Sequence, residues 1–210
     1  MLKKLNFPLS GSVDDFTRVK KEMYNVLLTL NKSNGIYDDF SKEDLKLFVN
    51  KLVESQRRDL TEPCNCSWCI PENKDHMPSD ARIDFIFEPT YIAVAILTYV
   101  KSSFHDVAIS VEGFDDCLKN GMKFSTLRQL SGHGYASFES TLNAIRIFDL
   151  GRVPEYLSKN RSFNVDLYLL FQQIYHQVVS DLNHKNTKDL WSNDLSSGMK
   201  EIVEKLQYVG

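Results

Sequence analysis

Three cysteines and a histidine lie close together in one polar segment of the chain: Cys64, Cys66, Cys69 and His76. Three thiolates and one imidazole are a sufficient ligand set for tetrahedral zinc. A bound metal would also order a segment that has few apolar residues of its own. Two other interpretations remain open, because the same cysteines could be reduced thiols without a role, or a disulfide or redox pair. A zinc cofactor is therefore one of three possibilities.

A second group of reactive side chains precedes the apolar run that begins at Tyr91. It holds Asp80, Arg82, Asp84 and Glu88, whose even spacing places them on one side of an extended chain. In a helix, residues 84 and 88 share a face instead. The functional interpretation is a polar opening that binds a ligand. The alternative is a helix start that favours acidic side chains, with Arg82 paired to a neighbouring carboxylate.

A histidine between two glycines forms the third candidate, in the turn Gly132-His133-Gly134-Tyr135 that follows Arg128. Histidine titrates near neutral pH and suits proton transfer or ligand binding. The glycines would allow the backbone to approach whatever the imidazole touches. In the alternative interpretation, His133 only caps the helix that ends near residue 129.

These last two groups could form one site if segments 80–91 and 128–135 meet at the same end of a helical bundle. The site would be a polar pocket that binds or transforms a small molecule. Its candidate catalytic residues are Asp84, Glu88 and His133, because a carboxylate and an imidazole can act as general acid and base. The candidate ligand-binding residues are Asp80, Arg82, Tyr91, Arg128 and Tyr135.

The alternative function belongs to a different class. The chain would be a protein-interaction module without catalysis, organised by the cysteine-containing loop, with or without zinc. The sequence does not decide whether the protein is an enzyme. Cys117 enters neither hypothesis, because it lies on the apolar face of a predicted helix and is expected to be a buried core residue.

The elements that would position these residues are helices. Apolar residues recur at spacings of three and four, and Ser12 and Ser41 each stand three positions before an acid, as at a helix start. The first helix is expected to end at Asn34-Gly35 and to form a helical hairpin with the second. Residues 91–100 are apolar nearly all round and predict a buried helix with Pro89 in its first turn, although a buried strand remains open. Further helices are predicted over 114–127, 137–150, 165–182 and 196–207.

Residues 119–135 carry a family resemblance. A basic residue precedes Gly121, and Phe124, Gln129 and a glycine-rich turn that ends in an aromatic residue follow. This pattern resembles the repeat of the terpenoid-cyclase and protein-prenyltransferase superfamily, which folds as an α/α toroid of paired inner and outer helices. The resemblance covers residues 90–158 and implies paired helices, in a partial ring. Because this sequence lacks the family's aspartate-rich diphosphate-binding run, the resemblance does not imply isoprenoid chemistry.

Composition completes the expected architecture. With 210 residues, 42% of them hydrophobic, the chain predicts a single all-α domain over 1–210, a paired-helix bundle with an N-terminal arm at 1–11 and a long loop at 58–80. A net charge of −3 argues against a dedicated nucleic-acid binder. No apolar run is long enough to span a membrane, and the first residues do not resemble a signal peptide, so we expect a cytoplasmic protein that binds neither membrane nor nucleic acid.

Overall fold

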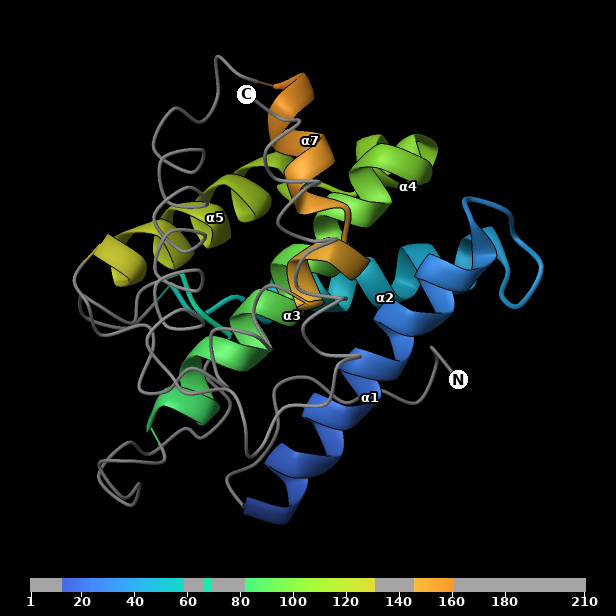
Figure 1. The fold of residues 1–210 in the computed structure, drawn as a ribbon. Helices are drawn as coiled ribbons and strands as arrows, with labels where there is room; N and C mark the ends of the chain where they lie inside the picture. Colours follow the sequence, from blue (N-terminus) through green and yellow to red (C-terminus); the bar gives the residue numbers. More distant parts are fainter. Residues whose placement is uncertain (1–12, 59–65, 69–81, 131–145, 161–210) are drawn as a thin grey trace, which may run out of the picture.

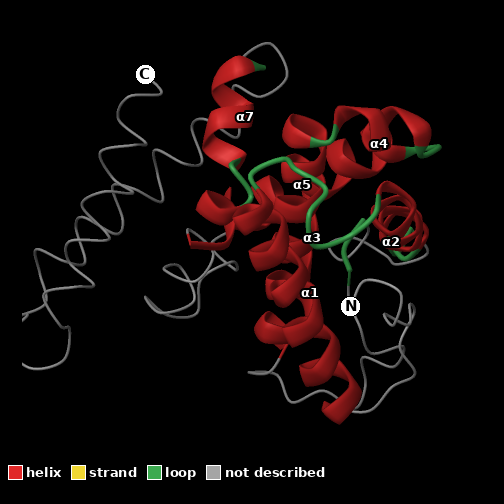
Figure 2. Ribbon diagram, turned by 90° about the vertical axis from the view of Figure 1, so that its right-hand side faces the viewer, coloured by secondary structure: helices red, strands yellow, loops and turns green. Residues whose placement is uncertain are grey.

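The described part of the chain is helical. The computed structural model describes residues 13–58, 66–68, 82–130 and 146–160, and the structural statements below refer to these residues (Figure 1). Helices and short connections make up these ranges, without a strand among them (Figure 2). An isolated antiparallel bridge pairs Arg57 with Ser67. The predicted all-α fold class is therefore confirmed.

The first two helices begin and end where the local sequence indicates. Helix α1 spans Val13–Ser33, and the chain then turns through Asn34 (φ 48°) and Gly35 (φ 84°), both in the left-handed region. Helix α2 spans Lys42–Glu54, and the Ser41 side chain accepts a hydrogen bond of 3.1 Å from the backbone N–H of Asp44. This bond satisfies one of the N–H groups that a helix start leaves without an intrahelical partner.

The predicted hairpin of these two helices is wrong. Within the described residues, α1 packs mainly against α3 (Arg82–Ser103), whereas α2 packs against the short helix α4 (His105–Ser110). The apolar stripe of α2 is nevertheless buried as predicted. The stripe comprises Leu45, Phe48, Val49, Leu52 and Val53. Periodicity fixed which face of each helix is buried, but it could not fix which helix covers that face.

Helix α3 is the central element. Every residue from Tyr91 to Val100 is buried, and the helix contacts α1, α4, α5 and α7 (Figure 1). The buried helix is confirmed, and the alternative of a strand is excluded. Pro89 was expected in the first turn, but α3 begins at Arg82, so the proline lies inside the helix. Proline lacks an N–H and removes one intrahelical hydrogen bond there.

The remaining helices cover α3. Helix α5 spans Phe114–Leu130, residues 146–150 are helical, and α7 spans Val153–Lys159. Four residues of α5 are buried, including Cys117 as predicted: Phe114, Cys117, Leu118 and Met122. His105 begins α4 and is exposed.

At Gly151, the helical segment 146–150 ends and the chain closely approaches α3. A Cβ atom on this glycine would lie 2.5 Å from the Cα of Ala95, in the middle of α3. Glycine therefore lets the backbone at 151 contact α3 directly. Buried Val153 and Leu157 of α7 continue the same contact with the core.

Two predictions about the whole chain reach beyond the described residues. Most of the glycine-rich turn that carries the toroid resemblance lies at 131–135, outside these residues, so the toroid stays a prediction, as does the single domain over 1–210. A search of the described helices for a segment that could span a membrane finds none of sufficient length and apolarity.

Candidate functional site

The cysteine-containing loop has a fixed base. The backbone N–H of Arg57 donates to the Ser67 carbonyl over 2.8 Å, and the N–H of Cys66 donates to the Arg57 carbonyl over 2.7 Å. Cys66 itself adopts a left-handed φ of 67°, which is uncommon for a residue with a side chain. The two ends of segment 59–65 are thus held together by paired backbone hydrogen bonds.

Trp68 anchors this base in the core, with only 2% of its surface exposed. Its indole Nε1 donates to the Leu52 carbonyl over 2.8 Å, and its backbone N–H donates to Thr90 Oγ1 over 3.1 Å. Gly121 of α5 leaves room for the ring, because a Cβ there would lie 2.8 Å from it. The sequence suggested that little besides a metal could order this loop, but a buried tryptophan joins its base to α2, α3 and α5.

A buried glutamine connects the loop base to α5. The amide Nε2 of Gln56 donates to two carbonyls, that of Cys66 over 3.2 Å and that of Cys117 over 3.0 Å. Its Oε1 accepts a hydrogen bond from Arg58 Nε over 3.3 Å. One side chain therefore satisfies acceptors on both the loop base and α5, as a buried amide must.

The same cluster contains a thiol with a shifted pKa. Burial raises the pKa of Cys117 to about 12, whereas the positive charge and hydrogen bond of Arg58 act in the opposite direction. Cys117 is therefore protonated at neutral pH, as expected of a core cysteine. Sequence reasoning missed its contact with the loop base, because residues 56–58 and 117 are far apart in the chain and no local pattern links them.

The zinc hypothesis concerns residues that lie mostly outside the described ranges. Cys66 is described, whereas Cys64, Cys69 and His76 are not. Among the residues that the structure does describe, no three His, Cys, Asp or Glu side chains are grouped so that they could hold a metal ion. Zinc binding by these four residues stays a prediction.

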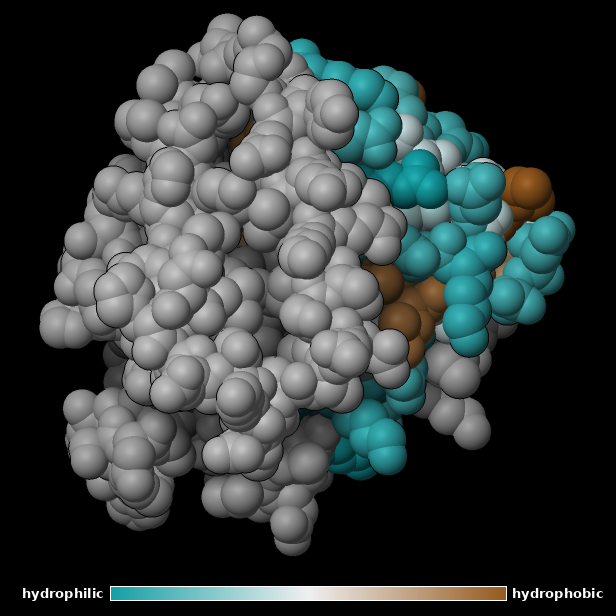
Figure 3. Space-filling view, viewed as in Figure 1, coloured by the Kyte–Doolittle hydropathy of each residue, from teal (hydrophilic) through white to brown (hydrophobic). Residues whose placement is uncertain are grey.

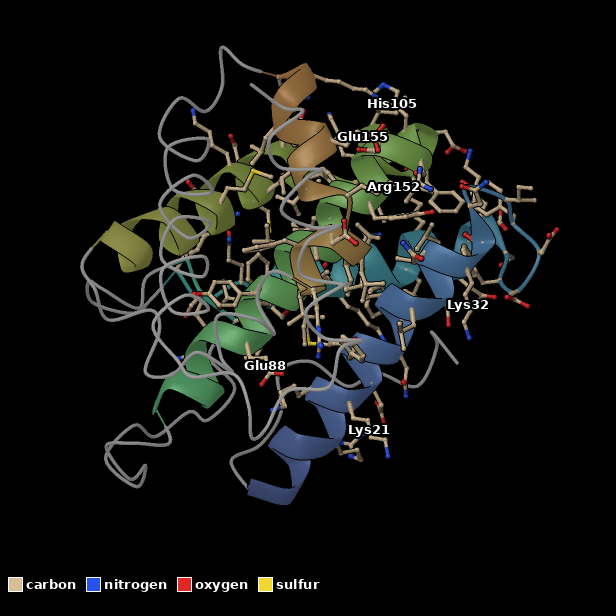
Figure 4. The ribbon with its side chains drawn as sticks, in the orientation of Figure 1. Lys21, Lys32, Glu88, His105, Arg152 and Glu155 are labelled. Carbon is tan, nitrogen blue, oxygen red and sulfur yellow. The ribbon has the colours of Figure 1, made fainter. Side chains whose placement is uncertain are left out.

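Two residues of the predicted pocket take part in helix packing. Glu88 accepts a hydrogen bond of 2.6 Å from Lys20 of α1, with 27% of the lysine side chain and 23% of the glutamate side chain exposed. Figure 4 shows Glu88 on the side of α3 that faces α1. Tyr91 is buried, and its ring packs against that of Phe148 at 5.2 Å between centroids. These contacts place both residues between helices.

For some of the other pocket residues the structure gives only the position of the backbone, and the rest lie outside the described residues. Arg82 and Asp84 lie in the first turn of α3, so residues 84 and 88 are one helical turn apart, and the extended alternative is excluded. Arg128 lies in the last turn of α5. Asp80, His133 and Tyr135 lie outside the described residues. The meeting of segments 80–91 and 128–135 therefore stays a prediction.

A surface that the sequence did not single out lies where the α1–α2 turn meets α4. We call it the turn–α4 face and define it by Ile36, Tyr37, Lys42, Asp106 and Ile109. The Tyr37 hydroxyl donates to Asp106 over 2.9 Å, and Lys42 pairs with the same carboxylate at 2.7 Å. Ile36, which precedes Tyr37, is 57% exposed, and Ile109, three residues after Asp106 on α4, is 69% exposed. Apolar surface is visible near the turn at the right-hand edge of Figure 3.

The hydrogen bonds of this face are reflected in two pKa shifts. Partial burial, and then the hydrogen bond to Asp106, raise the pKa of Tyr37 to about 12. The hydrogen bond from Lys42 is the main cause that lowers the pKa of Asp106. At neutral pH the face therefore holds a neutral phenol, a carboxylate and an ammonium group in one network.

Comparisons with known proteins found no relative of this chain. No protein-family model matches the chain, and neither a curated protein nor a solved structure is significantly similar to it.

Proposed function

We propose that the chain is a protein-interaction module that binds its partner at the turn–α4 face. The observation that carries this proposal is the exposure of Ile36 and Ile109, which neighbour the hydrogen-bonded Tyr37–Asp106–Lys42 group in the chain. Exposed apolar side chains surrounded by polar ones are typical of protein-binding surfaces. An aromatic residue fixed by a hydrogen bond loses little conformational freedom on binding, so it suits the centre of such a surface.

The charge around this face indicates the chemistry of the partner. Asp38 and Asp39 are exposed in the turn, Glu43 lies close enough to influence Tyr37, and Glu112 is exposed after α4. The one lysine of the face is already paired with Asp106. We therefore expect a partner segment with apolar side chains flanked by Lys or Arg, since complementary charge steers association.

In this proposal the cysteine-containing loop is a second element that organises the module, with or without zinc. Its support is the base formed by Gln56, Ser67 and Trp68, all of which are buried. A base fixed in the core would hold the two ends of segment 59–65 at a defined place. We propose a cytoplasmic location and a protein partner rather than a membrane or a nucleic acid. The net charge of −3 supports the exclusion of a nucleic acid.

The test uses a labelled amphipathic helical peptide with leucine on one face and lysine on the other. We expect it to bind the wild-type protein, and Ile109→Lys to weaken binding about 10-fold, because apolar contact is lost and a like charge is added. Fluorescence anisotropy measures the affinity, and circular dichroism checks that the variant remains folded.

The matched control is Leu47→Lys. Leu47 is an exposed apolar residue, 45% accessible, on α2 but outside the turn–α4 face. This control introduces the same change of charge and should leave the affinity unchanged. A tenfold loss in both variants, or equal binding of a peptide in which glutamate replaces lysine, would contradict the proposed surface.

The second candidate is the small-molecule pocket formed by segments 80–91 and 128–135, with Asp84, Glu88 and His133 as its catalytic residues. The observation that favours it is the partly buried Lys20–Glu88 pair, one helical turn from residue 84.

For this candidate, compounds that raise the melting temperature of the wild-type protein would first be identified in a metabolite screen. We expect His133→Ala to keep the helical circular-dichroism signal and to lose the stabilisation by these compounds. His105→Ala is the control, because His105 is exposed on α4 and belongs to neither segment. Unfolding of His133→Ala, or full stabilisation of that variant, would count against the pocket.

A further inference from the structure

The backbones of Cys66 and Cys117 are brought close to each other by one shared hydrogen-bond donor, although the two residues are far apart in the sequence. The Nε2 atom of Gln56 donates to the carbonyls of both residues, over 3.2 and 3.0 Å. Two carbonyls that share one donor nitrogen belong to neighbouring backbone segments, and disulfide formation requires such neighbouring backbones. Both residues carry thiols in this structure.

The surroundings of the two cysteines differ in a way that suits a stepwise reaction. Cys66 is partly exposed at the loop base, so a small reagent in solution can reach it. Cys117 is fully buried on α5. Arg58, the residue after Arg57 of the isolated bridge, is hydrogen-bonded to Gln56 and to the Cys117 side chain. The guanidinium thus lies next to the Cys117 side chain and is connected through Gln56 to the backbone of Cys66.

We propose that Cys66 and Cys117 form a redox modification site, at which hydrogen peroxide converts the two thiols into a disulfide between the loop base and α5. The Cys66 sulfur attacks one peroxide oxygen, the O–O bond breaks, and one water leaves with Cys66 oxidised to the sulfenic acid. The Cys117 thiol, which is protonated at neutral pH, then gives its proton to the departing hydroxyl group as its sulfur attacks the Cys66 sulfur, so the S–O bond breaks and a second water leaves. Two thiols and one peroxide thereby give one disulfide and two waters.

The disulfide would have a defined mechanical effect. Trp68 and Gln56 already attach the loop base to the core by packing and hydrogen bonds, and the new bond would make this attachment covalent. In the cytoplasm thiols are kept reduced, so the bond would form under oxidative stress and be reversed by cellular reductants. This site is independent of the proposed docking surface, which lies on different elements.

The experiment uses the full chain carrying Cys64→Ser and Cys69→Ser, in which Cys66 and Cys117 are the remaining cysteines. The reduced protein is treated with one equivalent of hydrogen peroxide and digested without reductant. We expect mass spectrometry to find the peptides of Cys66 and Cys117 joined in the monomer. Since a disulfide removes conformational freedom from the unfolded chain, the melting temperature should rise by roughly 5–10 °C and return to its initial value with dithiothreitol.

Two single variants of the same protein serve as controls. Adding Cys66→Ser, or separately Cys117→Ala, should abolish both the joined peptide and the rise in melting temperature. The proposal is overturned if peroxide gives only sulfinic acid or a disulfide-linked dimer. It is also overturned if wild-type protein binds one zinc ion that protects Cys66, or joins Cys64 to Cys69 while leaving Cys117 as a thiol.

Discussion

Replacing Gly151 by alanine is expected to destabilise the protein by about 3 kcal/mol, at the upper end of the usual cost of overpacking. The added Cβ would lie 2.5 Å from the Cα and Cβ of Ala95 and 2.7 Å from its carbonyl oxygen. The Cα and the carbonyl oxygen are backbone atoms in the middle of α3, and the Cβ is bonded directly to that backbone. None of the three can therefore rotate away. Relief requires the segment at 146–151 to move off the core. Urea denaturation at an unchanged m-value measures the loss.

Gly121→Ala is the matched control for this variant. Its Cβ would lie 2.8 Å from the Trp68 ring and 3.0 Å from a methyl group of Val94, and both of these are side-chain atoms that can shift. We expect a loss of about 1–2 kcal/mol, smaller than that of Gly151→Ala. If the two variants ranked in the opposite order, the direct backbone contact at Gly151 would be wrong.

Trp68→Ala is expected to cost about 4 kcal/mol of the free energy of unfolding, because it removes a fully packed aromatic side chain and leaves a cavity. Domains of this size are stable by about 5–15 kcal/mol, so the variant would lose a large part of its stability. The change also removes the hydrogen bond from the indole Nε1 to the Leu52 carbonyl. Thermal unfolding followed by circular dichroism at 222 nm measures the effect.

The comparison variant is Trp68→Phe. Phenylalanine keeps much of the apolar contact but loses the donor to Leu52, which leaves a buried carbonyl with less hydrogen bonding. We expect a loss of about 1–2 kcal/mol for this variant. If Trp68→Ala melted at the wild-type temperature, the loop base would not be anchored by this residue.

Local sequence signals predicted the parts of the fold that depend on neighbouring residues. The Ser41 cap, the stop at Asn34-Gly35 and the buried stripe of α2 are all encoded within one or two helical turns. The buried helix was also predicted, because a continuous apolar run from Tyr91 to Val100 leaves no polar face. Its start was misplaced at Pro89, since the pattern could not show that a helix of 22 residues tolerates one missing hydrogen bond.

Features that depend on distant contacts could not be predicted in the same way. The short helices α4 and α7 hold fewer than two full turns each, too few for a periodic pattern to be recognised. The Lys20–Glu88 pair joins residues 68 positions apart. The burial of Trp68 depends on a space left by Gly121, which no feature near residue 68 reveals. The predicted pocket has the same difficulty. Its residues can be chosen from the sequence, but whether segments 80–91 and 128–135 meet depends on long-range packing.

The apolar surface of α3 has a consequence for synthesis of the protein on the ribosome. Residues 91–100 leave the exit tunnel before α5 and the segment around Gly151 and α7, which later contact them. A nascent chain that ends between these elements would expose to water the apolar faces of α3 that α5 and α7 later cover. Such an intermediate is prone to aggregate, so we expect chaperones to bind it until the C-terminal covering helices have been made.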